Sequence, residues 1–479
     1  MTANPLAPAW LDVPLDANAL AAQVWPPTAT RTDAGELTVA GVSATALAAE
    51  FGTPLYVLDE QSVRDRAREA QDAFSRELEA RGSTATVYYA GKAFLSAELA
   101  RWVTEEGLNV DVCTGGELAL ALAAGVEPGR IGFHGNNKSL AEIDRAVSVG
   151  VGTIVIDSDI EIDRVAEAAV RHGRTQRVRL RVNSGVDAHT HEYLATALQD
   201  QKFGIPLADV PRAATRIRAH DSLDFLGLHS HIGSQILDTD AFAEAARRLL
   251  AVHAELCEVA PVPELNLGGG YGIAYTSSEQ APSLTEVAAD LARIVEAECG
   301  RLGIPLPVLA VEPGRAIVGA AGITLYEVGT IKDVTVHDVT VYDDAATTDA
   351  GTAVRRYVSV DGGMSDNART ALYAADYTAR LANRTSSAEP VLVRVAGKHC
   401  ESGDIVVRDE YLPADVAPGD VLAVAATGAY CWSLASNYNF VGRPPVVAVR
   451  DGVARVIVRG ETEAEVLARD AGIPGWGER

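Results

Sequence analysis

Short apolar runs alternate with helical stretches from Val87 to Arg315, and no other feature of the sequence limits the fold as strongly. Each run has the length of a buried strand, ends in glycine or polar residues, and precedes a stretch rich in alanine and glutamate. The runs are Val87–Ala90, Val110–Cys113, Ile131–His134, Ile154–Asp157, Val178–Val182, Leu226–His231, Leu265–Gly268 and Val308–Val311. About eight strand–helix units in this span predict a TIM (β/α)8 barrel, and a doubly wound open sheet is the alternative.

Residues capable of chemistry lie at or just beyond the ends of these runs. They are Lys92, Asp111, His134 with Asn136, Asp157, Asn183, His231, Gly268 to Gly270, and Glu312 with Arg315. Barrel enzymes build their active sites at the carboxyl ends of the strands. The positions of these residues therefore indicate an enzyme as well as a barrel.

A second domain is predicted after Gly319, where the sequence pattern changes. Valine, threonine and tyrosine alternate there with polar residues between glycine, proline and aspartate turns, which is typical of a mostly β structure. The alternating segments are Ile323–Val334, Tyr357–Val360, Val391–Val395 and Val421–Ala425. We expect the polar insertion Asp338–Arg355 to form an exposed hairpin or loop, and the N-terminal extension, residues 1–35, to be loosely structured.

The net charge of −24 and the cysteine content limit the partners and the compartment. A strongly acidic surface repels nucleic acid and anionic membranes, so an anionic cofactor must be held by local donors. Five scattered cysteines without a CxxC pair indicate free thiols in a reducing cytoplasm and no metal site of the zinc type. No apolar run approaches the ~18 residues of a membrane span, and the N-terminus lacks the pattern of a signal peptide. We therefore expect a cytoplasmic protein that binds neither nucleic acid nor a membrane.

Lys92 and Glu312 form the central pair of the predicted site. A lysine just past the first barrel strand points into the barrel mouth, where partial burial favours the neutral amine that forms a Schiff base with a carbonyl group. A carboxylate that faces a pyridine nitrogen keeps it protonated, so the ring accepts the electrons released when a bond at Cα breaks. The alternatives are a solvated loop lysine and a structural ion pair between Glu312 and Arg315.

A glycine-rich loop, Gly268–Gly270, follows the seventh run, near the place where barrels usually bind phosphate. Ser234 could add a hydroxyl group to the same phosphate, and His231 could stack flat on a bound ring. A tight turn is the alternative for the glycines, and a buried core histidine is the alternative for His231.

Two motifs in the predicted β domain add reactive groups. Cys400 lies between glycines and beside Glu401, which favours an exposed functional loop over a small buried thiol, and a thiol can return a proton to a carbanion. Arg369 offers a bidentate fork for a carboxylate, and Tyr373 lies four residues later, so on a helix the two share a face. Ordinary surface pairing is the alternative for Arg369 and Tyr373.

Together these motifs resemble the fold-type III decarboxylases that use pyridoxal 5'-phosphate (PLP), a family that includes ornithine decarboxylase and shares its barrel with alanine racemase. The motifs, in family order, are Tyr-Ala-Gly-Lys92-Ala, His229-Ser-His-Ile-Gly-Ser234, Gly268-Gly-Gly270, Glu312-Pro-Gly-Arg315, Cys400-Glu-Ser-Gly-Asp404 and Gly428-Ala-Tyr430. The stretches His134–Ser139 and His189–Gly204 are also similar to the family. The most specific similarity is to the diaminopimelate decarboxylases.

The resemblance implies roles for individual residues. Lys92 is the Schiff-base lysine, His231 stacks on the PLP ring, and Cys400 donates a proton, so these three are the expected catalytic residues. The expected cofactor contacts are Lys92, Asp111, His231, Ser234, Gly270, Glu312, Pro313, Gly314, Arg315 and Tyr430, with Glu312 on the pyridine nitrogen and Ser234, Gly270, Gly314 and Tyr430 on the phosphate. The expected substrate contacts are Arg315, Arg369, Tyr373, Glu401 and Tyr430.

The resemblance also implies an assembly and a domain organisation. The family works as a homodimer in which Cys400 and Glu401 reach into the partner subunit's site. Strands from residues 36–57 would complete a β-barrel formed by residues 319–479, and residues 58–318 would form the PLP-binding TIM barrel.

The implied reaction is the decarboxylation of meso-2,6-diaminopimelate to L-lysine and CO2, the last step of bacterial lysine biosynthesis. A racemase on the same fold is expected to place arginine at the pyridine nitrogen, and Glu312 argues against it. A decarboxylase of a related basic amino acid or of a carboxylated polyamine is a second alternative. A non-catalytic homologue that acts as a binding protein is a third, although such proteins typically lose the lysine or the thiol.

Overall fold

The structure is a computed structural model that describes residues 4–186, 202–343 and 346–473. The chain divides into two compact units. Unit 1 comprises Met1–Ser62, Ala274–Gln280 and Val318–Arg479, and unit 2 comprises Val63–Ile273 and Ala281–Ile317. His189 and His191, which belong to one of the family-like stretches, lie outside the described residues.

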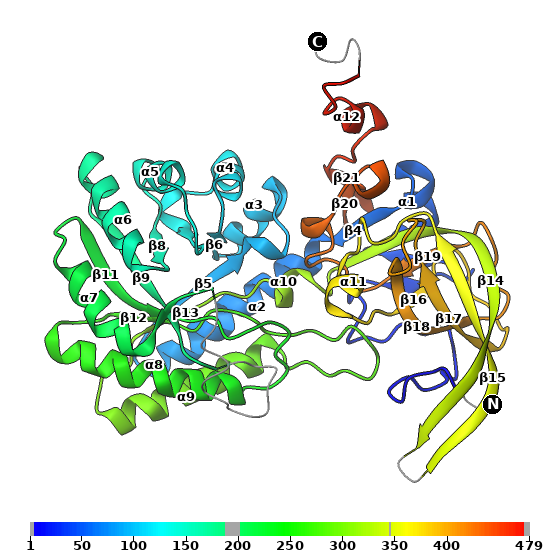
Figure 1. Ribbon diagram of the computed structural model, residues 1–479, viewed down its shortest axis with the longest axis horizontal. Helices are drawn as coiled ribbons and strands as arrows, with labels where there is room; N and C mark the ends of the chain where they lie inside the picture. Colours follow the sequence, from blue (N-terminus) through cyan, green and yellow to red (C-terminus); the bar gives the residue numbers. More distant parts are fainter. Residues whose placement is uncertain (1–3, 187–201, 344–345, 474–479) are drawn as a thin grey trace. The chain divides into compact units, whose positions relative to one another are not determined.

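Unit 2 is built around a closed parallel sheet (Figure 1). Its strands are β5 (Ala85–Ala90), β6 (Asn109–Val112), β7 (Ile131–Phe133), β8 (Thr153–Ile156), β9 (Gln176–Asn183), β11 (Leu223–His229), β12 (Glu264–Asn266) and β13 (Val308–Val311). Each strand pairs in parallel with the next one in this order, and β13 pairs in parallel with β5. The predicted TIM barrel is therefore confirmed, and the open-sheet alternative is wrong because the sheet closes on itself.

The helices of the strand–helix units begin and end at local sequence signals. They are α3 (Ala97–Glu105), α4 (Gly115–Ala123), α5 (Leu140–Val149), α6 (Asp159–Arg171), α7 (Val210–Arg218), α8 (Asp240–Val259) and α9 (Leu284–Leu302). In α9, Ser283 and Glu286 form a capping box, and Gly303 ends the helix in the left-handed conformation. The same combination of capping box and terminal glycine bounds α5. These signals set where each chain segment returns to the barrel, and thus which residues follow each strand.

Unit 1 is mostly β, as predicted. Its main strands are β4 (Leu55–Asp59), β14 (Gly322–Asp343), β15 (Ala346–Val360), β16 (Ala379–Leu381), β17 (Pro390–Ala396), β18 (Ile405–Pro413), β19 (Val421–Val424), β20 (Val446–Arg450) and β21 (Val453–Val458). Strand β4 precedes the barrel in the sequence, yet it pairs antiparallel with β14 and parallel with β20. The chain before the barrel thus supplies a central strand of this unit, and that strand ends slightly past the segment 36–57 expected to contain it.

The insertion Asp338–Arg355 forms the end of a long hairpin. Strands β14 and β15 pair from Val328↔Val360 to Asp343↔Ala346. The expected hairpin is therefore confirmed.

The N-terminal extension is irregular, as expected, but it is not loosely held. Val24 and Trp25 are buried. Strand β1 (Thr30–Arg31) pairs with β2 (Leu37–Val39), which in turn pairs with β3 (Val42–Ser43). The sequence signal was misleading because the segment is held by a few buried side chains and side-chain hydrogen bonds, which leave no periodic pattern.

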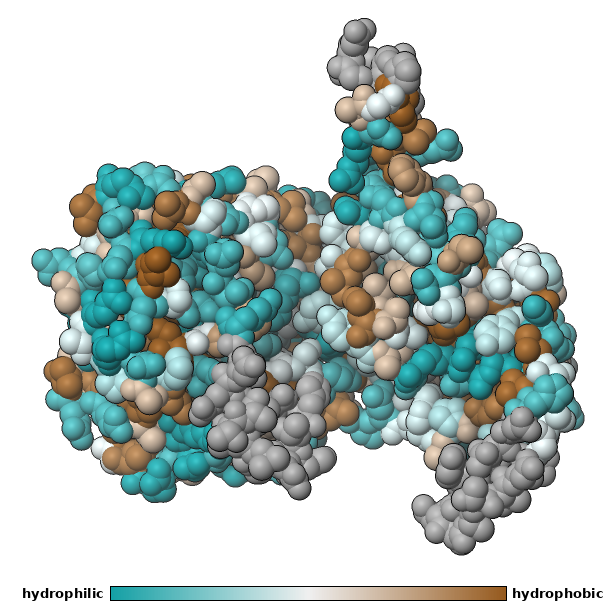
Figure 2. Space-filling view, in the orientation of Figure 1, coloured by the Kyte–Doolittle hydropathy of each residue, from teal (hydrophilic) through white to brown (hydrophobic). Residues whose placement is uncertain are grey.

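None of the helices in the described part of the chain is long and apolar enough to cross a membrane. On the face shown in Figure 2, hydrophobic residues are interspersed with hydrophilic ones in both units.

Candidate active site

Glu312 lies at the carboxyl end of β13 in a buried polar pocket of unit 2. Its Oε1 atom is 3.1 Å from Nε2 of His229 and 3.5 Å from Nε2 of His134. The Nδ2 atom of Asn266 donates a hydrogen bond to the same oxygen over 2.7 Å. Strands β11 and β12 thus deliver two donors to one carboxylate, and His134, which follows β7, lies beside it.

The surroundings of Glu312 keep it ionised. Burial acts to raise the pKa of Glu312, but the interactions with His229 and His134 outweigh burial and hold this pKa well below its ordinary value. Burial lowers the pKa of His134 and the pKa of His229 to about 4. At neutral pH the acid is therefore charged and both imidazoles are neutral. Nε2 of His229 can donate to Glu312, whereas Nε2 of His134 has no hydrogen-bond partner within the described residues.

Asp111, on β6, is the second carboxyl group in this pocket. Its Oδ1 atom lies 3.1 Å from Nε2 of His134. Burial, and then the charge of Glu312, raise the pKa of Asp111 well above its ordinary value. The surroundings therefore shift the pKa values of the two acids in opposite directions, downward for Glu312 and upward for Asp111.

His134, His229 and Glu312 also lie close enough together to bind a metal ion, since their ligand atoms are all within 4.8 Å of one another. Asn266, however, directs an N–H donor at the Glu312 oxygen that such an ion would use. A carboxylate that already accepts N–H donors suits a protonated ring nitrogen better than a cation. The expectation of no metal site stays a prediction.

A second part of the site is the pair of loops that follow β11 and β12. Gly268 and Gly270 have φ values of +70° and +111°, which side chains rarely adopt. A Cβ atom at Gly270 would lie 2.5 Å from the carbonyl oxygen of Gly233. The loops are joined because Ile236 N donates to Gly270 O over 2.9 Å, and Ile236 O accepts from Gly272 N over 2.9 Å. The glycines therefore bring two backbones together, as a phosphate cradle requires.

Ser234 lies in the first of these two loops. Its Oγ atom accepts a hydrogen bond from Nη2 of Arg315 over 2.8 Å. Pro313 and Gly314 follow Glu312, and the carbonyl oxygen of Pro313 accepts from the N–H of Ala90 over 3.1 Å. A hydroxyl group, a guanidinium group and two glycine turns thus lie on one side of the barrel mouth.

Lys92 follows β5 in a short 3-10 turn, η1 (Gly91–Ala93). It is exposed there, so the partial burial expected for this lysine is not observed. Strand β5 is the neighbour of β13, which ends at Glu312. Burial, and then the positive charge of Lys92, lower the pKa of His231 well below its ordinary value. The charges of Lys92 and Glu312 both act on Asp111 and on His231. Lys92, His231 and Glu312 therefore lie close enough in unit 2 for their charges to interact.

The remaining predicted residues lie in unit 1. Cys400 and Glu401 are exposed on the loop between β17 and β18. The buried Asp404 carboxylate holds the base of this loop, because it accepts hydrogen bonds from the N–H of Met364 over 2.6 Å and of His399 over 2.7 Å. The two functional side chains are thus presented to solvent on a fixed backbone.

Arg369 and Tyr373 begin and end α11 (Arg369–Tyr373), so the expected helix is confirmed. Their environments differ: Arg369 is buried, whereas Tyr373 is 67% exposed. The shared face inferred from their spacing stays a prediction, because α11 has only one turn and Ala374 ends it in the left-handed conformation. Tyr430 has a φ value of +67°, which is strained for a bulky residue and frequently marks a functional position.

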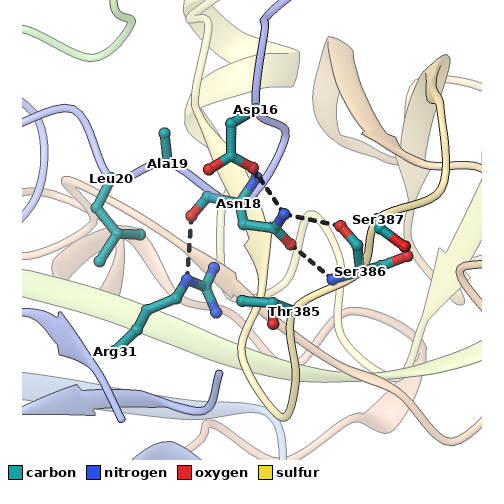
Figure 3. A pocket seen from close by; sticks show the side chains of 8 residues that line it. All are labelled: Asp16, Asn18, Ala19, Leu20, Arg31, Thr385, Ser386 and Ser387. Atoms are coloured by element: carbon teal, nitrogen blue, oxygen red, sulfur yellow. Dashed lines mark hydrogen bonds between the residues drawn. The ribbon is translucent and has the colours of Figure 1, made fainter. Parts of the chain in front are cut away.

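A cavity of about 470 Å³ in unit 1 is a different feature from this site (Figure 3). Its lining includes Asp16, Asn18, Arg31 and Ser386. These polar groups bond to one another or to backbone carbonyls, as with Asn18 and Asp16 over 2.7 Å and Ser386 N and Asn18 over 3.0 Å. The cavity is therefore an internally satisfied junction of the N-terminal extension with the β domain.

Two residues of the barrel pocket were missed by sequence reasoning. His229 and Asn266 both lie at strand ends, the position that indicated the other candidates. His229 is part of the quoted His229–Ser234 motif, so its place at a strand end could have revealed it. Asn266 carried no signal because a lone asparagine before a glycine run is more commonly a turn residue.

A barrel with a lysine, a histidine, a glycine-rich turn and a buried ionised glutamate at the ends of its strands is typical of the class of PLP enzymes that share the alanine racemase fold. A family model described as "Pyridoxal-dependent decarboxylase, pyridoxal binding domain" matches residues 60–319. A curated diaminopimelate decarboxylase of Mycobacterium bovis is 52% identical over 94% of this chain and 98% of its own length. The diaminopimelate decarboxylase of Bacillus subtilis is 42% identical over 91% of this chain and 95% of its own.

Solved structures agree with these relatives. The crystal structure of diaminopimelate decarboxylase from M. jannaschii superposes with a TM-score of 0.83 at 32% identity and covers 94% of this chain and 99% of its own. A further structure of that protein is a co-complex with L-lysine. The chain belongs to the diaminopimelate decarboxylase family, and PLP is its cofactor.

Proposed function

We propose that this chain decarboxylates meso-2,6-diaminopimelate to L-lysine and CO2, with the site residues acting as set out below. The observation that carries the proposal is the buried Glu312 carboxylate, which hydrogen bonds from Asn266 and His229 hold in its ionised form. Bound PLP supplies a sink for the electron pair that is released when the Cα–carboxylate bond breaks. An acid at the pyridine nitrogen supports this chemistry, whereas the arginine expected in a racemase would suppress it.

Each residue of the barrel mouth has one role in the proposal. Lys92 would hold the cofactor covalently until the substrate amine takes its place. Glu312 would keep the pyridine nitrogen protonated, and His231 would limit the tilt of the ring. Ser234 and the loop at Gly270, with Gly314 and Tyr430, would bind the phosphate. Asp111 would contact the cofactor beside Glu312.

The remaining residues would recognise the substrate and complete the reaction. Cys400 would return a proton to Cα after CO2 has left. Arg369 and Arg315 would bind the distal carboxylate, and Glu401 would bind the distal ammonium group. Tyr373 and Tyr430 would line the same space. A substrate without the distal carboxylate would leave a buried arginine unpaired, at a cost of ~1–3 kcal/mol.

The substrate assay compares CO2 release from meso-diaminopimelate, ornithine, arginine and lysine. We expect kcat/KM for meso-diaminopimelate to exceed the others by at least about tenfold, from the unpaired arginine alone. Comparable turnover of ornithine or lysine would contradict the assignment of the substrate. In the same preparations, the Lys92→Ala variant should lose the visible absorption band of the lysine-bound cofactor.

The proposal includes a cytoplasmic homodimer with shared sites. Cys400 and Glu401 are exposed in the single chain, and large apolar residues near their loop are exposed as well, namely Leu372, Tyr373, Tyr438 and Phe440. Tyr438 is tied to the loop because its ring lies 5.3 Å from that of His399. Exposed aromatic residues beside a reactive loop are typical of a surface that a partner covers. The cysteines in the described residues form no disulfide bond, which agrees with a reducing compartment.

Mixing two inactive variants tests the shared site. Lys92→Ala and Cys400→Ala each destroy both sites of a homodimer. After dissociation and reassociation in equal amounts, half of the dimers would combine one chain of each kind and contain one intact site. About a quarter of the wild-type activity should then return. Mass measurement verifies that subunits have exchanged. If no activity returns in the mixed dimers, Lys92 and Cys400 act within one chain.

A further inference from the structure

Arg369 is held at one corner by a buried tyrosine. The Nη1 atom of Arg369 donates a hydrogen bond to Oη of Tyr377 over 2.6 Å. Both residues are buried, and both lie in unit 1. Because the bond occupies one end of the guanidinium plane, it restricts rotation of the group about its long axis.

Two aromatic rings pack on the same guanidinium group. Its Cζ atom lies 4.8 Å from the ring centroid of Tyr275 and 5.7 Å from that of Tyr377. The two rings meet edge to face with their centroids 5.2 Å apart. Both distances are within the range of cation–π attraction, so the rings limit the tilt of the plane while the hydrogen bond limits its rotation.

A ring of hydrogen bonds returns from Tyr377 to the backbone of Arg369. Oη of Tyr377 lies 3.5 Å from Sγ of Cys431, and Sγ in turn donates to Oδ1 of Asn367 over 3.6 Å. The same Oδ1 accepts the N–H of Arg369 over 3.4 Å. Since Sγ donates to Asn367, the hydroxyl of Tyr377 is the donor to Cys431, and the hydroxyl oxygen is left to accept from Arg369.

Tyr377 and Tyr275 together form a clamp around the guanidinium group of Arg369. This clamp leaves one edge of the group available. No hydrogen bond joins Nε or Nη2 of Arg369 to any residue in the described ranges, whereas Nη1 is occupied. Nε and Nη2 together form the side-on fork that binds a carboxylate with two parallel hydrogen bonds. A carboxylate that approaches this edge needs no rearrangement of the arginine.

Tyr275 also connects the clamp to the barrel along the chain. It belongs to Ala274–Gln280, the short segment that is part of unit 1 although the sequence on both sides is part of unit 2. Thr378 supports it by donating from Oγ1 to the carbonyl oxygen of Tyr275 over 3.0 Å. Gly270, in the glycine-rich loop, lies only five residues earlier.

We propose that Tyr377 and Tyr275 are positioning residues that orient the free edge of Arg369 toward the distal carboxylate of the substrate, and so set the preference for substrates with a second carboxylate. This inference rests on the proposed role of Arg369 in substrate binding. The tyrosines themselves contact neither the reacting atoms nor the cofactor in the proposal. Their effect should therefore appear in KM and in specificity rather than in kcat.

The test is steady-state kinetics of the full-length holoenzyme with Tyr377→Phe, Tyr275→Leu and the control Tyr411→Phe. Tyr411 is also a buried tyrosine of unit 1, but it lies on β18 and is not part of the clamp. We expect Tyr377→Phe to raise KM for meso-diaminopimelate about tenfold, from the loss of one charge-assisted hydrogen bond, with kcat within about threefold of wild type. The slow turnover of lysine, which has no distal carboxylate, should stay unchanged. Tyr411→Phe should match wild type in all three quantities.

Other outcomes separate the clamp from the proposed function. Arg369→Ala could raise KM while Tyr377→Phe and Tyr275→Leu both behave like the control. In that case the positioning role of the two tyrosines is wrong, and the role of Arg369 in substrate binding stands. If Arg369→Ala leaves KM unchanged, the proposed substrate contact fails first. A fall in kcat equal for meso-diaminopimelate and lysine would indicate general damage and would overturn the positioning role. Should Tyr377→Phe fail to fold, Tyr275→Leu decides the matter by the same KM criterion.

Discussion

Asn266 donates a hydrogen bond from Nδ2 to Oε1 of Glu312 over 2.7 Å, while its own Oδ1 accepts the N–H of Gly268, also over 2.7 Å. The N–H of Gly268 can donate only to the oxygen of the Asn266 side-chain amide. The NH2 end of that amide must therefore face Glu312. Asn266 is fully buried and has no room to turn. The amide therefore presents a fixed donor that favours the ionised form of Glu312.

Replacement of Asn266 by alanine should weaken the binding of PLP. Without its donor, Glu312 loses a charge-assisted hydrogen bond worth about 1.5–3 kcal/mol, and the dissociation constant of PLP should rise by about tenfold or more. Titration of the apoenzyme with PLP, followed by absorbance, measures this constant directly. Asn109→Ala is the control, because Asn109 begins β6 at the opposite end of the barrel. Equal affinities in the two variants would mean that Asn266 does not support the acid.

His253, on α8, should make the stability of the protein depend on pH. It is buried, its Nδ1 has no hydrogen-bond partner within the described ranges, and burial lowers its pKa to about 4. The unfolded chain binds a proton below about pH 6.5, whereas the native state does so only below about pH 4. The free energy of unfolding should therefore fall as the pH drops through this window.

Substitution of His253 by glutamine should remove this part of the pH dependence. Between pH 7 and pH 5, wild type should lose about 2 kcal/mol more than His253→Gln. Denaturation with urea at the two pH values measures the difference. His220→Gln is the control, since His220 is partly exposed beside Asp163. If wild type and His253→Gln lose the same free energy of unfolding, protonation of His253 does not destabilise the folded state.

Asp404→Ala should disable the Cys400 loop while leaving the barrel able to bind PLP. The substitution removes the acceptor for two buried N–H groups, those of Met364 and His399, and each unsatisfied group costs about 1–3 kcal/mol. We expect decarboxylation to fall at least tenfold as the loop loses its conformation, with PLP uptake close to wild type. Asp376→Ala, which breaks only a partly exposed pair with Arg408, is the control. A parallel loss of PLP uptake would point to unfolding of the chain instead.

Arg31→Ala should destabilise unit 1 through the N-terminal extension. The guanidinium of Arg31 donates to the carbonyl oxygens of Asn18, Gly35, Arg384 and Leu381. Part of this arrangement is visible in Figure 3. Loss of these bonds should lower the free energy of unfolding by about 2–4 kcal/mol and make the first 35 residues sensitive to protease. Arg459→Ala, at an exposed pair with Glu465, should change neither.

Much of the barrel could be predicted because its determinants are local. The eight apolar runs correspond to the eight strands, and Lys92, Asp111 and Glu312 occupy the strand ends where the pattern placed them. The hydrogen-bond donors around Glu312 were harder to predict from the sequence. Asn266 acts through one hydrogen bond to a residue 46 positions away, and a single sequence contains no pattern for such a contact.

The sequence by itself determined the alternation of strands and helices, the cofactor class and the candidate residues, since periodicity, capping signals and motif spacing are all short-range properties. Only the tertiary structure decided in which direction the pKa of Glu312 is shifted, how Arg369 is clamped, and that Ala274–Gln280 belongs to unit 1 rather than unit 2. Ionisation and side-chain orientation depend on burial and on partners distant in the chain. Both arise when the barrel closes and the strands of the second unit pair.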